Sequence, residues 1–297
     1  TTLTCKETSN DKQSTDILNE FIALDSTVYT TNIDIIKTKL KENRMIVLCT
    51  YHSSKLLEKQ EFDLGIFDEA HKTVNNDVFG YMLSNDNCKI TERIYFTATP
   101  RYYKGKDDKC MSMDNKSLYG DSCYEYSFKK AIEEKHILDF EIISYTVPEN
   151  MNDIIYEKYI KNDKLNVHST VLISAIQLAQ HIKNGMNCNK ILTYHNTVNN
   201  AVEFKKTLCY IFEKLNVKAN VYVLNGSMSM NFRTKTISEF ESSEIAIICS
   251  AKVLNEGVDI PCVNTVMFVD SRESTIDVTQ CIGRAMRLYK NQNKCNI

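Results

Sequence analysis

Short runs of apolar residues alternate with amphipathic stretches along the chain. The runs are rich in β-branched side chains and occur at residues 45–49, 64–67, 94–96, 190–194, 221–224, 244–249 and 263–269. Each run has the length of a strand. Because the apolar residues follow one another without regular polar alternation, they indicate strands covered on both faces, as in a parallel sheet.

Between the apolar runs, hydrophobic residues recur every three or four positions. Residues 171–182 and 202–215 show this spacing, which is typical of a helix that buries one face. Strands and helices that alternate along a chain predict an α/β fold with parallel sheets. The 297 residues are about twice a common domain length of ~150, so we expect two domains.

The boundary between the domains is expected near residues 138–150. Ser127 is placed to cap a helix that runs to His136, residues 140–147 have the pattern of a strand, and Pro148 closes it. We therefore divide the chain into domains at 1–143 and 144–297.

Composition narrows the function classes without selecting one. The chain has 36 basic and 38 acidic residues and a formal charge of −2, so nucleic acid would be bound by placed groups rather than by bulk charge. The apolar content of 43% excludes disorder as the main state. No apolar run approaches the ~20 residues of a membrane helix.

Cysteine usage indicates a reducing environment. The chain has 11 cysteines without a C-x-x-C pair or zinc-finger spacing, and several end apolar runs, where a thiol acts as a small hydrophobe. We expect an intracellular, reducing location: cytoplasm, nucleus or a viral factory.

Two adjacent carboxylates, Asp68 and Glu69, end the apolar run at 64–67. In open α/β sheets, ligands bind at the carboxyl ends of strands. There, one carboxylate can hold Mg²⁺ and the next can deprotonate a water. The simpler interpretation is an acidic helix start that suits the helix dipole.

Thr97 and Thr99 follow the next apolar run and precede Pro100. Two hydroxyls at a strand end can bond the neighbouring carboxylate turn and relay its state to another site. An ordinary turn closed by proline would have the same sequence.

Residues 280–287 hold two arginines, Arg284 and Arg287, three positions apart and hence on one helical face. Arginine is suited to stabilising charge on a transferring phosphoryl group. The alternative is a cationic helix C-terminus. Residues 250–261 place Gly257 and Asp259 in a turn, where an acidic group could accept from a ribose hydroxyl.

Taken together, these strings resemble the superfamily 2 DNA/RNA helicases, in particular the DEAH-containing group near type III restriction subunits. Residues 49–53 resemble the T-Y-x-S element that contacts nucleic acid and precedes motif II in that group. The segments similar to motifs II, III, IV, V and VI are residues 68–71, 97–99, 191–196, 250–261 and 280–287.

The resemblance implies two RecA-like domains, the first one incomplete, with ATP in the cleft between them and single-stranded DNA or RNA held by its backbone. Asp68 would hold Mg²⁺ and Glu69 would activate water. It further implies catalysis by Glu69, Gln280, Arg284 and Arg287, nucleotide binding by Asp68, His71, Gly257 and Asp259, coupling by Thr97 and Thr99, and nucleic-acid contacts by Thr50, Tyr51 and Ser250.

One element of this group is missing from the sequence. No G-x-x-x-x-G-K-[ST] string occurs, and the one Gly-Lys pair, at residues 105–106, is followed by Asp107. Since residues 2–5 resemble the strand after motif Ia and the first residue is Thr, we expect an amino-terminally truncated fragment that is inactive alone.

Three functions stay open at this point. The sequence favours an ATP-dependent helicase or translocase motor core. The first alternative is a nucleic-acid-binding module without ATPase activity, and the second is the motor subunit of a restriction complex. A phosphate-binding loop in the parent protein would separate a motor from a binding module.

Overall fold

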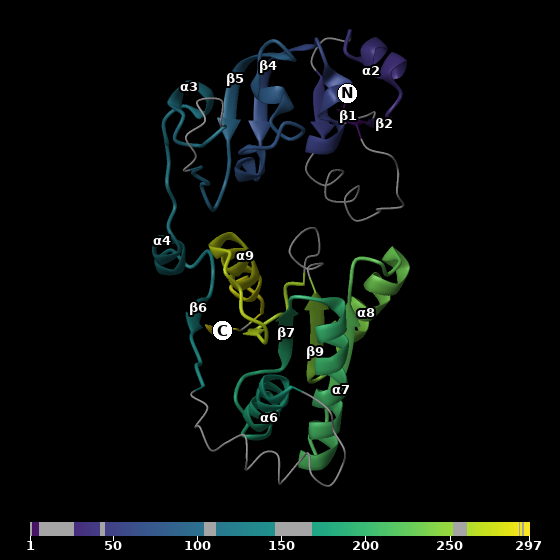
Figure 1. Cartoon of the computed structure of the whole chain (residues 1–297), viewed down its shortest axis with the longest axis vertical. Coiled ribbons are helices and arrows are strands. Elements are labelled where there is room, and N and C mark those ends of the chain that lie inside the picture. Colours follow the sequence, from purple (N-terminus) through teal and green to yellow (C-terminus); the bar gives the residue numbers. More distant parts are fainter. Residues whose placement is uncertain are drawn as a thin grey trace. The chain divides into compact units, whose positions relative to one another are not determined.

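In the computed structural model, the described residues are 2–5, 27–41, 45–103, 111–145, 168–251, 260–290, 292 and 294–297. They divide into two compact units, Thr1–Glu125 and Tyr126–Ile297 (Figure 1). The helix and strand that follow residue 125 thus lie in the second unit, whereas the sequence division at 143 assigns them to the first domain.

The first unit contains two parallel sheets. Three strands in the order β2-β1-β3 form one of them, and β4 pairs with β5 in the other. The strands are β1 (Thr2–Cys5), β2 (Thr27–Tyr29), β3 (Ile46–Cys49), β4 (Glu61–Phe67) and β5 (Lys89–Tyr95). The helices are α2 (Ile33–Lys39) and α3 (Lys116–Tyr119), with 3-10 helices η1 (Tyr51–Leu57), η2 (Ala70–Thr73) and η3 (Tyr81–Leu83).

The β4–β5 sheet is covered on one face and open on the other. Phe67 and Ala70 pack into the core of the unit, while Leu64 and Ile66 of β4 and Ile94 of β5 are 49%, 64% and 41% exposed. The expectation that apolar runs mark strands buried on both faces is therefore wrong for β4 and β5, because no described segment covers these three side chains.

The second unit is built on one six-stranded parallel sheet in the order β6-β11-β10-β7-β9-β8. The strands are β6 (Asp139–Glu141), β7 (Lys190–His195), β8 (Asn220–Leu224), β9 (Ala246–Ala251), β10 (Thr265–Phe268) and β11 (Lys294–Asn296). The helices are α4 (Phe128–Glu133), α6 (Ser169–Lys183), α7 (Val198–Leu215), α8 (Met230–Ser242) and α9 (Thr275–Ala285).

Consecutive residues of β7 and β9 point into different cores. Ile191 and Ile247 pack with α6 and α7, whereas Leu192 and Ile248 pack with side chains of α8 and α9. Every residue of β7 and β9 is buried, as expected for apolar runs between two helical layers. The predicted α/β architecture with parallel sheets is confirmed.

The element boundaries depart from the sequence expectation in some places. The helix expected to reach His136 ends at Glu133, because Lys135 adopts φ +58°, which an α-helix does not accept. The helices α2 and α8 were not predicted. Among the described residues, no helix is long and apolar enough to cross a membrane.

Candidate functional site

The Asp68–Glu69 turn lies where β4 and β5 end. Phe96 N–H donates to the carbonyl of Phe67 at 2.8 Å, and Ala70 N–H donates to the carbonyl of Phe96 at 2.9 Å. These bonds fasten the residues after β4 to the residue after β5. The two carboxylates therefore lie at the carboxyl end of a parallel strand pair, where the sequence predicted them.

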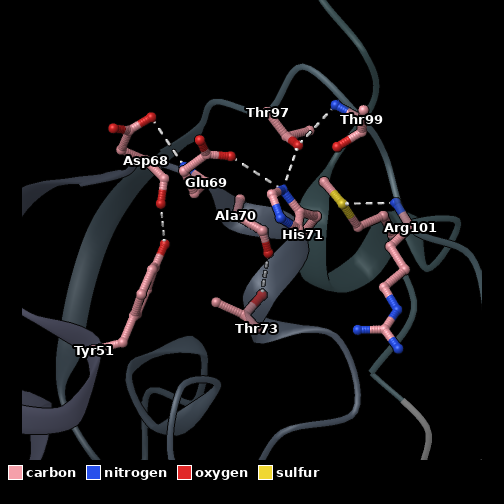
Figure 2. Close-up of polar contacts among 10 residues, drawn as sticks. Tyr51, Asp68, Glu69, Ala70, His71, Thr73, Thr97, Thr99 and Arg101 are labelled. Carbon is pink, nitrogen blue, oxygen red and sulfur yellow. Dashed lines mark hydrogen bonds and ion pairs between the residues drawn. The ribbon is translucent and has the colours of Figure 1, made fainter. Parts of the chain in front are cut away.

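Glu69 has an unusual backbone conformation for a residue with a side chain. Its φ of 51° and ψ of 43° lie in the left-handed region, which is unfavourable for all residues except glycine. Glu69 N–H donates to Oδ1 of Asp68 at 2.9 Å, and the Tyr51 hydroxyl donates to the Asp68 carbonyl at 2.6 Å (Figure 2). Local bonds thus support a strained turn.

His71 connects the carboxylate turn to the threonines after β5. Its Nδ1 lies 3.3 Å from Oε2 of Glu69 and 3.0 Å from Oγ1 of Thr97. Thr99 N–H donates to the same Oγ1 at 3.1 Å. The imidazole is 5% exposed. Figure 2 shows the resulting chain of contacts from Glu69 through His71 to Thr97 and Thr99, so four residues predicted for the site lie together.

The T-Y-x-S element begins the 3-10 helix η1. The Thr50 hydroxyl donates to that of Ser53 at 3.1 Å, and the Tyr51 ring stacks on Phe79 with 5.4 Å between centroids. Burial, followed by the nearby Asp68 carboxylate, raises the pKa of Tyr51. Its hydroxyl therefore stays protonated and able to donate at neutral pH. Sequence reasoning missed both its bond to Asp68 and Phe79, which lies within an ordinary apolar stretch.

In the second unit, Gln280 and Arg284 lie four residues apart on α9, with Arg284 in its last turn. Ser250 lies on β9 and is fully buried. Its Oγ has no hydrogen-bond partner among the described residues. Since buried hydroxyls are nearly always hydrogen-bonded, this one is suited to a bond with a ligand or a water. Gly257 and Asp259 lie outside the described residues.

Arg287 does not share a helical face with Arg284, which corrects the expectation from their spacing. The helix α9 ends at Ala285 with Met286 as its C-cap. The carbonyl of Met286 accepts from Leu138 N–H at 2.7 Å. In a longer helix, this carbonyl would accept from an N–H of the next turn instead. Burial lowers the pKa of Arg287.

A buried polar cluster occupies the end of β7 in the second unit. His195 is fully buried, and its Nε2 lies 2.9 Å from Oγ1 of Thr193. Burial lowers the pKa of His195 to about 4, so its imidazole is neutral at pH 7. Asp270 accepts from Asn196 N–H at 2.7 Å and from the Asn200 amide at 2.8 Å. These bonds join the end of β7 to the residues after β10.

The carboxylate chemistry of the first unit fits Mg²⁺ better than a metal held by protein groups alone. The described residues contain no group of three or more His, Cys, Asp or Glu side chains that could hold a metal ion. Mg²⁺ is commonly held by one or two carboxylates together with substrate phosphates and water. Asp68 is exposed and directly follows the strand, as such a ligand requires.

Two protein families match the chain. Residues 172–289 match the helicase conserved C-terminal domain, and residues 2–102 match the type III restriction enzyme, res subunit. The chain therefore contains one region similar to each of these two domains, and the two regions correspond to two RecA-like lobes. The resemblance stated from the motifs is confirmed at this level.

A curated relative and two solved structures agree with this assignment. "Probable helicase A859L" of African swine fever virus is 29% identical over 269 residues, 88% of this chain and 29% of the relative. The chain thus spans less than a third of that protein.

The ATP-dependent Type ISP restriction-modification enzyme LlaBIII, bound to DNA, has a TM-score of 0.76 at 20% identity, covering 100% of this chain and 22% of its own. A nuclease-deletion mutant of the Type ISP enzyme LlaGI with a DNA substrate mimic has a TM-score of 0.62 at 19% identity, covering 100% and 20%. At these identities, the likeness establishes the fold.

Proposed function

We propose that the chain is the motor core of an ATP-dependent nucleic-acid helicase or translocase. The observation that carries this proposal is the contact chain from Glu69 through His71 to Thr97 at the carboxyl ends of β4 and β5. It joins a carboxylate suited to proton abstraction to the Thr97 hydroxyl, which can report its state and also accepts from Thr99 N–H. An acidic turn without a catalytic role would not need a buried imidazole between a carboxylate and a threonine hydroxyl.

In the proposed reaction, Glu69 orients the attacking water and takes its proton. Asp68 holds Mg²⁺, which supplies charge neutralisation to the phosphates when it is bound. Gln280, Arg284 and Arg287 face the phosphates and stabilise the charge that grows on the transferring phosphoryl group. The proposed nucleotide contacts also include His71, Gly257 and Asp259.

The second substrate in this proposal is a single strand of nucleic acid, held by its backbone. Thr50 and Ser250 are the proposed contacts, together with the segment around Tyr51, whose own hydroxyl is engaged by the Asp68 carbonyl. Contacts of this kind position a strand without reading its bases. DNA is the first choice over RNA, since the LlaBIII and LlaGI structures contain DNA or its mimic.

The nine cysteines whose side chains are described are free thiols, which supports a reducing, intracellular location.

The motor subunit of a restriction complex is the second candidate. The match of residues 2–102 to the type III restriction res subunit and the fold shared with two Type ISP enzymes favour it. Such a subunit would use the same site for translocation on double-stranded DNA rather than for strand separation.

Strand displacement and triplex displacement separate the candidates. Both are measured with a P-loop parent, that is, a protein in which the 297 residues are joined to a segment that carries a Walker A string. ATP-dependent strand displacement identifies a helicase, and triplex displacement alone identifies a translocase. Nucleic-acid binding that is indifferent to ATP in both assays would contradict the motor proposal and favour a binding module.

A further inference from the structure

The peptide between Asp68 and Glu69 is held at both ends. Its carbonyl accepts from the Tyr51 hydroxyl at 2.6 Å, and its N–H donates to Oδ1 of Asp68 at 2.9 Å. The first bond crosses from η1 to the end of β4, while the second stays within the turn. Tyr51 therefore provides the tie that fixes this peptide to another element of the unit.

The turn has an intrinsic tendency to leave this conformation. Rotating the peptide by a half-turn would change φ of Glu69 from 51° to −129° (51 − 180), which lies on the negative side of φ that residues with a Cβ atom favour. The left-handed value is unfavourable for a residue with a Cβ atom. Rotation would also turn the Asp68 carbonyl away from Tyr51 and the Glu69 N–H away from Oδ1 of Asp68.

We propose that Tyr51 is a positioning residue for ATP hydrolysis, whose hydroxyl holds the Asp68–Glu69 peptide in the conformation that aims both carboxylates. The inference rests on the proposed function of Glu69. Tyr51 is suited to this task because its ring is stacked on Phe79, which holds the hydroxyl in position at the Asp68 carbonyl. In Figure 2 the hydroxyl of Tyr51 points to the backbone of Asp68 rather than to its carboxylate.

This role differs from a nucleic-acid contact, which the T-Y-x-S resemblance implies for the same residue. The Tyr51 hydroxyl has one hydrogen to donate. While this hydrogen is bonded to the Asp68 carbonyl, it cannot also be donated to a phosphate. Loss of the hydroxyl should therefore change turnover and leave nucleic-acid affinity nearly unaltered. A contact residue would show the opposite pattern.

The chain offers a matched control for the removal of one tyrosine hydroxyl. Tyr95 OH donates to the Leu118 carbonyl at 3.1 Å, and both Tyr51 and Tyr95 pack at the core of the first unit. Tyr95→Phe removes a comparable bond without touching the Asp68–Glu69 peptide. The comparison with Tyr51→Phe thus separates positioning from general packing.

The first measurement is amide hydrogen exchange over residues 67–72 in the 297-residue chain. We expect Tyr51→Phe to raise exchange of the Glu69 and Ala70 amides about tenfold, the equivalent of one typical hydrogen bond, while Tyr95→Phe leaves them within about twofold. Equal exchange in the two variants would overturn the proposal.

The second measurement is steady-state ATP turnover in the P-loop parent. We expect Tyr51→Phe to lower kcat about 5- to 10-fold, with KM for nucleic acid within about twofold of the unaltered protein. A raised KM with unchanged kcat would overturn the proposal, since it identifies a contact residue. If the unaltered parent shows no turnover, the proposed function fails and the exchange comparison alone decides whether Tyr51 holds the turn.

Discussion

In the first unit, the two carboxylates that follow β4 keep contact with solvent, whereas in the second unit the polar residues at the ends of the central strands β7 and β9 are buried. Asp68 is exposed and Glu69 half-buried in a strained turn, next to a sheet with one open face. His195 and Ser250 lie without exposure among strands that are covered on both faces. The two units share a parallel α/β design but place their polar groups in different environments.

This difference separates two physical tasks. A carboxylate that binds a cation or activates water must keep access to ligand, which an exposed strand end provides. His195 is fully buried and cannot do so, and it depends instead on fixed partners such as the Thr193 hydroxyl. We therefore expect changes in the first unit to affect turnover and changes in the buried cluster of the second unit to affect stability.

The largest effect is expected from Glu69→Gln in the P-loop parent. Loss of a general base typically slows a reaction ~10²–10⁴-fold, while ATP affinity should stay close to normal because the amide keeps the shape of the side chain. Glu92→Gln, an exposed glutamate on β5, is the matched control. Near-normal turnover in Glu69→Gln would exclude the proposed role.

Arg284→Ala and Arg287→Ala should each lower turnover by about 10²-fold, with a smaller effect on ATP affinity, if they act on charge that grows in the transition state. Arg233→Ala on α8 controls for loss of an arginine from the same unit. Single-turnover rates and equilibrium nucleotide binding separate the two effects. If both variants lose affinity alone, the arginines are ground-state ligands.

Joint replacement of Thr97 and Thr99 with alanine should separate hydrolysis from movement. Thr97 and Thr99 end the series of contacts that begins at Glu69 and passes through His71. We expect strand displacement per ATP to fall by about tenfold while ATP turnover changes less than threefold, since one or two hydrogen bonds of ordinary strength are lost. Thr91→Ala, exposed on β5, is the control. Equal losses in both assays would contradict a coupling role.

The buried cluster of the second unit predicts a pH-dependent stability. Burial lowers the pKa of His195 to about 4, while an unfolded histidine has a pKa of about 6.5. The unfolded state therefore binds the proton more readily, and stability should be lost as the pH falls from about 6.5 towards about 4, by roughly 3 kcal/mol from this group.

His195→Gln should remove this part of the pH dependence, whereas His136→Gln, at an exposed position, should keep it. Urea unfolding of the unaltered chain and both variants at several pH values measures the difference. Identical pH profiles in all three proteins would show that His195 is not buried in its neutral form.

The sequence predicted the strand ends better than the contacts that connect them. Asp68 and Thr97 were placed correctly because an apolar run ends just before each of them, and parallel strands bring such ends together. The bond between Tyr51 and Asp68 could not be predicted, since it joins residues 17 positions apart through the packing of η1. Likewise, the arginine spacing gave a wrong helical face because α9 ends at Ala285, before the turn that would carry Arg287.

Weak periodicity explains the elements that were not predicted. Two residues of α8, Thr236 and Phe240, are buried, so its apolar face is too sparse to stand out in the sequence. The open face of the β4–β5 sheet was also not predictable, because the apolar residues at 64–67 have the same pattern as strands that are covered on both sides.

Steady-state ATP turnover with single-stranded DNA, compared between the 297-residue chain and a parent protein that supplies a P-loop, tests the central claim most directly. The 297 residues contain no Walker A string, and backbone N–H groups and the lysine of such a loop cradle and neutralise the phosphates. We predict background turnover from the chain alone and DNA-stimulated turnover from the parent. Turnover from the 297 residues that Glu69→Gln abolishes, or none from the parent, would contradict the account.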